Sequence, residues 1–162
     1  TFKYIVSHNY QRIARAEKTF TESMYTEKST LESNRVRIYI WEVSWKIIKD
    51  NFWLGVGTGD IHDALNEQYR QAGMDAAVKE NLNAHNQYIQ AFLATGAIGL
   101  VILLSGMLIP FWQSIKRKNY IFVMFVFIIG FNFIFESILE VQAGVVFYAF
   151  FNSFLLFNDT GG

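Results

Sequence analysis

The stretch "AFLATGAIGLVILLSGMLIPFW", which runs from Ala91 to Trp112, carries no charged residue. As a helix, about 22 residues reach about 30 Å, the thickness of a bilayer's hydrocarbon core. Two shorter apolar stretches follow at residues 120–135 and 141–157, and the first of these is interrupted by Asn132. A buried core helix would explain either short stretch alone, but three apolar stretches in succession predict a membrane protein.

We therefore expect an all-α integral membrane protein with about three transmembrane helices, covering residues 88–112, 120–138 and 141–158. These spans make up a transmembrane region over residues 91–162. Most charged residues precede it, so residues 1–90 are expected to form a helical loop region outside the cytoplasm. The chain begins at Thr1 in a hydrophobic run without a signal-peptide pattern, which predicts a fragment of a longer chain.

The loop between the first two spans carries the adjacent basic residues Lys116, Arg117 and Lys118. The positive-inside rule assigns such a loop to the cytoplasm. The first span then enters from outside, so His85 and the later Glu136 share the extracytoplasmic side. Over the whole sequence, 14 Lys and Arg balance 14 Asp and Glu, which gives no argument for nucleic-acid binding. Without cysteine, the chain has neither disulfides nor thiolate chemistry.

Within residues 1–90, an amphipathic helix is expected over 34–51, because apolar residues recur there at helical spacing. They are Ile40, Trp41, Val43, Trp45, Ile47 and Ile48. Shorter helices are expected over 60–72 and 74–82. Between the first two helices lies "GVGTGD", residues 55–60. It lacks the P-loop Lys-Ser/Thr, so we interpret it as a tight turn. A weaker alternative is that its amides approach an anionic head group.

Arg37 shares a helix face with Trp41 and Ser44, at spacings of four and three. An arginine beside aromatic residues at a membrane surface is suited to bidentate contact with phosphate oxygens. The alternative is a solvated surface arginine. Glu136 and Glu140 are four residues apart, which predicts one helical face. Pairing with an arginine is the expected role of these carboxylates, and acid–base work is the alternative.

The three histidines show neither HxxxH nor HExxH spacing, so no metal site is expected. Four motifs resemble, in their order, the O-antigen ligase and polymerase superfamily. They are "RIYIW" (37–41), "GVGTGD", "AHNQYIQ" (84–90) and a span with "GAIGL". The later "ESILEVQAGVVFYAFF" is similar to the closing helices of that superfamily, and the whole resemblance covers residues 33–157. The chain departs from the pattern in "KDNFWLG", where many members have a proline.

This resemblance implies a multi-pass protein of the bacterial inner membrane, with residues 1–90 in the periplasm. Its members move a glycan from an undecaprenyl-diphosphate carrier to an acceptor hydroxyl, without a metal, a nucleotide sugar or another cofactor. For an O-antigen ligase the acceptor is the lipid A core, in lipopolysaccharide biosynthesis. The family's histidine falls on His85, as general base, and its loop arginine on Arg37, which would bind the diphosphate. Other family arginines would precede Thr1, so the fragment alone is expected to be inactive.

Arg35, Tyr88 and Gln90 are further candidates for orienting the sugar or the base. A polysaccharide polymerase or a protein O-oligosaccharyltransferase of the same superfamily would keep the fold and change the acceptor to a glycan or a protein. A membrane transporter or a non-catalytic assembly module is the alternative from another class. Transport should place ionisable groups within the spans, and the interiors of these spans carry none apart from Glu136 near an edge.

Overall fold

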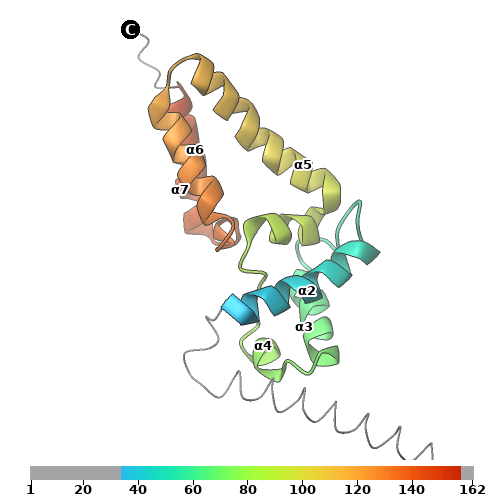
Figure 1. Cartoon of the computed structure of the whole chain (residues 1–162). Helices are drawn as coiled ribbons and strands as arrows, with labels where there is room; N and C mark the ends of the chain where they lie inside the picture. Colours follow the sequence, from blue (N-terminus) through green and yellow to red (C-terminus); the bar gives the residue numbers. More distant parts are fainter. Residues whose placement is uncertain (1–33, 158–162) are drawn as a thin grey trace, which may run out of the picture.

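The computed structural model describes residues 34–157, apart from the side chains of residues 34 and 35, and within this range it contains helices and no strand. The helices are α2 (Asn34–Asp50), α3 (Ile61–Gln71), α4 (Asp75–Lys79), α5 (Gln87–Lys116), α6 (Tyr120–Asn132), the 3₁₀ helix η1 (Ile138–Glu140) and α7 (Gln142–Phe157). Figure 1 shows two groups: α2, α3 and α4 lie together, and α5, α6 and α7 extend away from them. The all-helical part of the predicted fold class is confirmed.

The group of α2, α3 and α4 is held together by the apolar faces that the helical period creates. In α2, Val36, Ile40, Val43 and Ile47 recur at spacings of three and four, and all are buried. They form one core with the buried face of α3, which consists of Ile61, Leu65 and Tyr69. The helix α4 ends at Lys79, short of the expected residue 82, because Asn81 takes a positive φ of 50°.

The long helix α5 is broken at Gly96, which has φ 64° and ψ −164°. Figure 1 shows the consequence: the first part of α5 lies across the molecule beside α2, and the second part turns away and rises. The predicted span over 88–112 lies within α5, but the sequence did not predict its break at Gly96. The part that follows the break, residues 97–116, is still about 20 residues long and reaches about 30 Å.

The backbone groups freed by this break are taken up by the loop over residues 52–57. Val56 N–H donates to the Leu93 carbonyl at 2.8 Å, and Ala97 N–H donates to the Phe52 carbonyl at 2.8 Å. The two backbones cross so closely that a Cβ on Gly96 would lie 2.3 Å from the Trp53 carbonyl. Because only glycine fits such a crossing, the loop and the break form one structural unit.

The glycine-rich segment 55–60 is a turn that packs against α5, as its glycines suggest. Gly55 and Gly57 have positive φ values of 69° and 95°. Gly55 N–H donates to the Asn51 carbonyl at 2.9 Å, and Gly57 N–H donates to the Ala94 carbonyl at 3.0 Å. Since these amides already have backbone partners, they are not free to cradle a phosphate.

Among the described residues, α5 is the one helix long and apolar enough to cross a membrane. The helices α6 and α7 are apolar but shorter, with 13 and 16 residues. The expected span over 120–138 was too long, because α6 ends at Asn132. Beyond it, the Phe133 and Ile134 carbonyls accept hydrogen bonds from Gln87 N–H and the Asn86 amide, at 2.8 and 3.0 Å, instead of continuing a helix.

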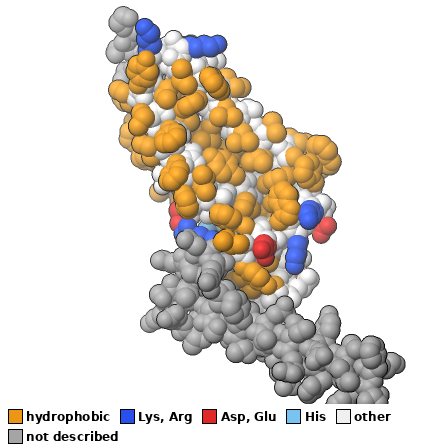
Figure 2. Space-filling model, in the orientation of Figure 1, with side chains coloured by type: hydrophobic (Ala, Val, Ile, Leu, Met, Phe, Trp, Pro, Cys, Tyr) orange, Lys and Arg blue, Asp and Glu red, His pale blue; other side chains and the backbone are white. Residues whose placement is uncertain are grey.

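Apolar side chains dominate the face of α5, α6 and α7 seen in Figure 2, and basic side chains lie at its far end. That end is the loop after α5, where Lys116, Arg117 and Lys118 are exposed. At the other end of this face, charged side chains reappear around α2. The apolar surface is thus a band bounded by charge on both sides, as a bilayer would require.

Candidate functional site

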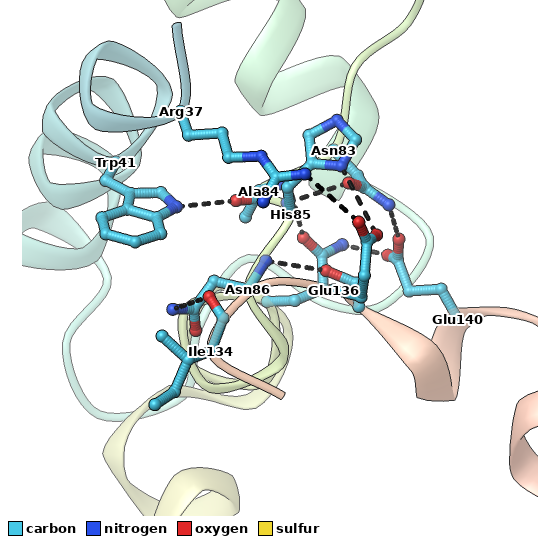
Figure 3. A network of polar contacts seen from close by, with 11 residues as sticks. Arg37, Trp41, Asn83, Ala84, His85, Asn86, Ile134, Glu136 and Glu140 are labelled. Carbon is cyan, nitrogen blue, oxygen red and sulfur yellow. Dashed lines mark hydrogen bonds and ion pairs between the residues drawn. The ribbon is translucent and has the colours of Figure 1, made fainter. Parts of the chain in front are cut away.

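Three charged or titratable side chains from distant parts of the sequence meet beside the first turn of α5. Arg37 comes from α2, His85 from the segment before α5, and Glu136 from the segment after α6 (Figure 3). Arg37 Nη2 lies 3.3 Å from Glu136 Oε1, and His85 Nδ1 lies 3.8 Å from Glu136 Oε2. One carboxylate therefore faces both the guanidinium and the imidazole, and the expected pairing of Glu136 with an arginine is observed.

The backbone at His85 is held in an uncommon conformation by its neighbours. Its φ is 45°, a value that few residues other than glycine adopt. His85 N–H donates to Asn83 Oδ1 at 2.9 Å. On the other side, the Ala84 carbonyl accepts from Trp41 Nε1 at 2.9 Å, and Ala84 N–H donates to Gln90 Oε1 at 3.2 Å. These contacts hold the backbone of the segment that carries the imidazole. A strained backbone conformation persists only where the surrounding structure holds it in this way.

Asn86 links the two chain segments that carry His85 and Glu136. As the N-cap of α5, its Oδ1 accepts from Tyr88 and Ile89 N–H, each at 3.0 Å. Its Nδ2 donates to the Ile134 carbonyl at 3.0 Å, and its backbone N–H donates to Ser137 Oγ at 3.2 Å. Asn86, the residue next to His85, thereby binds Ile134 and Ser137, which lie on the two sides of Glu136 in the sequence. Sequence reasoning did not identify Asn86, although an Asn before an apolar helix is an N-cap signal.

Glu140 supports the same segment from the end of η1. Asn83 Nδ2 donates to its Oε2 at 2.5 Å, and Gln90 Nε2 donates to its Oε1. Because the Gln90 side chain is buried and both of its amide atoms are engaged, it positions the His85 segment. The expectation that Glu136 and Glu140 share one helical face was wrong. Glu136 lies in the non-helical segment between α6 and η1, so no single helix carries both residues, although both line the same cavity.

The other candidate residues lie elsewhere. Tyr88 Oη donates to the Gly130 carbonyl at 2.9 Å, and its ring packs edge-on against Phe133, so it joins α5 to α6. Ser44 is buried and its hydroxyl donates to the Ile40 carbonyl, so it is already paired within α2. Arg35 lies in the first turn of α2, and its side chain is outside the described part of the structure.

A cavity of about 830 Å³ opens beside this cluster. Its volume falls within the range of small-molecule sites, about 300 to 1,000 Å³. His85 and Glu136 line it, together with Asn83, Gln90 and Glu140, and the start of α3 closes another side. Within residues 34–157, no three His, Asp or Glu side chains gather closely enough to hold a metal ion. The cluster can thus offer an imidazole and carboxylate acceptors to a ligand in the cavity, and Arg37, which does not line the cavity, adds a cation beside it.

A protein-family model described as O-antigen ligase matches residues 4–104 of the chain. The match includes Arg37, His85 and the break in α5, and it ends before Glu136 and the closing helices. The resemblance drawn from the four sequence motifs is confirmed by this match. No curated protein and no solved structure matches the chain.

Proposed function

The chain belongs to the O-antigen ligase family, and we propose that it transfers a glycan from an undecaprenyl-diphosphate carrier to an acceptor hydroxyl. Membership in the family supports a membrane enzyme that transfers lipid-linked glycans, of the ligase or polymerase type. The observation that carries the proposal is the meeting of Arg37, His85 and Glu136 beside a cavity large enough for sugars.

In the proposed reaction, His85 is the general base. In this proposal Nδ1, which faces Glu136 Oε2 at 3.8 Å, carries the proton of the neutral imidazole, and Nε2 accepts one. Nε2 takes the proton of the acceptor hydroxyl as its oxygen attacks the anomeric carbon. The bond from that carbon to the phosphate oxygen breaks, and the diphosphate leaves with the electron pair. Glu136 stabilises the imidazolium that forms.

Arg37 is proposed to bind the leaving diphosphate. Only one of its five guanidinium N–H groups is needed for the contact with Glu136, and the others are available for phosphate oxygens. Its side chain is 21% exposed, so it is partly desolvated and still accessible to a ligand. A positive group in this position stabilises the charge that develops on the leaving group.

The depth of the cluster also fits a substrate anchored in a membrane. We propose that α5, α6 and α7 cross the bacterial inner membrane, with the cavity on the periplasmic side and the loop 116–119 in the cytoplasm. A 13-residue helix such as α6 reaches about 20 Å, less than the hydrocarbon core of about 30 Å. Glu136, four residues beyond α6, would then lie at or below the periplasmic surface of the inner membrane, which is the depth of a lipid-borne diphosphate.

The chain's own charge distribution favours an enzyme over a transporter. No Asp, Glu, Lys or Arg occurs within residues 97–115, within α6 or within α7. A transport path through these helices would need such groups. A polysaccharide polymerase and a protein O-oligosaccharyltransferase would share the donor chemistry and differ in the acceptor.

Arg37→Ala in the full-length protein is expected to lower glycan transfer by about 10²-fold and to weaken binding of the lipid-linked donor. Arg37→Lys should recover only part of the loss, because an ammonium group lacks the planar fork. Turnover and donor binding are measured with purified protein in nanodiscs. Arg70→Ala is the matched control, since Arg70 is exposed on α3 and pairs with Glu67. Equal activity of the Arg37→Ala and Arg70→Ala proteins would contradict the role of Arg37.

The proposed topology is tested by single cysteines, because the 162-residue chain has none of its own. In a cysteine-free full-length background, Glu80→Cys should react with a membrane-impermeant maleimide added to the periplasmic side. Lys116→Cys should react only after the membrane is permeabilised. Both positions are exposed, so a difference reports sidedness and not burial. The reverse labelling pattern would invert the topology and remove the periplasmic site.

A further inference from the structure

The cavity has a polar wall on the α3 side that the proposed chemistry does not use. Thr58, Ile61 and His62 form this wall at the start of α3, and Asn81 adjoins it. Asn66, one turn after His62 on α3, donates through Nδ2 to Asn81 Oδ1 at 2.8 Å. The wall is thus built from α3 and from the segment that follows α4, and it is separate from Arg37 and Glu136.

Two side-chain atoms of α3 at or behind this wall are buried without a hydrogen bond, and of the two residues only His62 lines the cavity. They are Nδ1 of His62 and Oδ1 of Asn66, and neither has a partner among the residues that the structure describes. At a spacing of four, both lie on one face of α3. Buried polar atoms in folded proteins are nearly always hydrogen-bonded, so each unpaired one calls for a specific explanation. For His62, which lines the cavity, a ligand that Nδ1 reaches when the ring turns is such an explanation.

The chemistry of the cavity indicates which ligand. None of its lining residues is a lysine or an arginine. It offers the Asn81 and Asn83 amides, the Glu140 carboxylate, the His62 imidazole and apolar surface from Ile61. Amides, carboxylates and imidazoles bind hydroxyl groups, which both donate and accept, whereas a diphosphate needs cations or free amides. Such a lining suits an uncharged sugar next to the site where Arg37 would bind the diphosphate.

We propose that His62 binds a hydroxyl group of the carbohydrate, in a sugar subsite on the α3 side of the cavity. Within the described chain, Nδ1 forms no hydrogen bond. Rotating the imidazole ring by half a turn about the bond to Cβ therefore breaks no hydrogen bond at that atom. This inference rests on the proposed function. The hydroxyl can belong to the glycan on the carrier or to the acceptor.

The test uses the full-length protein in nanodiscs and compares His62→Ala and His62→Gln with wild type. The donor probes are undecaprenyl diphosphate and the same carrier bearing one N-acetylglucosamine. If the donor glycan is the ligand, wild type should bind the sugar-bearing carrier more tightly than the bare carrier. His62→Ala should then lower the affinity for the sugar-bearing carrier by about 3- to 10-fold, as expected for one hydrogen bond. Affinity for the bare carrier should stay unchanged. If the acceptor is the ligand, the KM for lipid A core oligosaccharide should rise by the same factor, with kcat within twofold.

Asp63→Asn is the matched control, because Asp63 is the next residue of α3 and is exposed. His62→Gln keeps a polar side chain of similar length and should retain part of the affinity. If the His62→Ala protein does not fold, the test is made with His62→Gln alone. Unchanged donor affinity and unchanged acceptor KM in the His62 variants would overturn the inference. An equal loss for bare and sugar-bearing carrier would also overturn it, since it would indicate a merely structural role. Bare-carrier binding that is insensitive to Arg37→Ala would instead count against the proposed function.

Discussion

Replacing His85 with alanine in the full-length protein is expected to lower glycan transfer by about 10²- to 10⁴-fold, the range typical for a lost general base. Donor binding should remain largely intact, because the imidazole acts on the acceptor hydroxyl and not on the diphosphate. The measurement is single-turnover transfer at saturating donor, with donor affinity determined separately. The segment around His85 is held by contacts to Asn83 and Ala84 that do not involve the imidazole, so the alanine variant should fold.

Two companion variants separate catalysis from structure. Glu136→Gln removes the charge that faces His85 Nδ1 while keeping the side-chain volume, so it should also lower turnover, but by less than His85→Ala. Glu80→Gln alters an exposed carboxylate of the segment before His85 and should leave turnover unchanged. A merely structural His85 would accept asparagine or glutamine. Near-normal transfer by both His85→Ala and Arg37→Ala, at matched expression, would refute the mechanism and leave the fold untouched.

The spacing of apolar residues predicts α2 well, because it depends only on neighbouring residues of the sequence. Apolar residues at spacings of three and four, such as Ile40, Val43 and Ile47, define a buried face whatever it packs against. The same rule explains why Tyr88 does not line the cavity. Gln87, Gln90, Ala91 and Ala94 recur at helical spacing and line the cavity. Tyr88 is one residue from this pattern, about 100° around the helix, and therefore faces α6. From the sequence alone, nothing fixes which face of the helix meets the cavity.

The features that escaped prediction depend on contacts between distant segments. Glu136 approaches Arg37 across 99 positions of the sequence, and Asn86 holds Ile134 across 48. The charge-based topology already assigned Glu136 and His85 to the same side of the membrane. It could not give their distance, because that depends on where α6 ends. The ending of α6 at Asn132 is in turn set by hydrogen bonds to the start of α5.

The break at Gly96 is the strongest case of this kind, since the residues on both sides of it are uncharged and mostly apolar. What distinguishes the position is the loop 52–57, which supplies partners for the freed backbone groups. The break directs the first part of α5, with Gln90 and the residues next to His85, along the cavity and not into the apolar band. The placement of the site therefore depends on a glycine that touches neither His85 nor Arg37.

Gly96→Ala is accordingly expected to destabilise the protein by about 3 kcal/mol or more, because it combines backbone strain with a steric clash. The Gly96 φ of 64° and ψ of −164° fall in a region essentially restricted to glycine. The new Cβ would also lie 2.3 Å from the carbonyl carbon and oxygen of Trp53, which are backbone atoms that no rotamer change can move. The measurement is the thermal unfolding midpoint of the full-length protein in detergent, together with the folded yield.

Gly106→Ala in the same helix is the matched control, since a Cβ there meets nothing within 4 Å and the residue is helical. It should be neutral or stabilising by up to about 1 kcal/mol, because alanine favours the helix over glycine. Equal unfolding midpoints for the Gly96→Ala and Gly106→Ala proteins would mean that α5 tolerates a straight path through residue 96. The first part of α5 could then leave the cavity without cost, and the position of His85 would not depend on the loop 52–57.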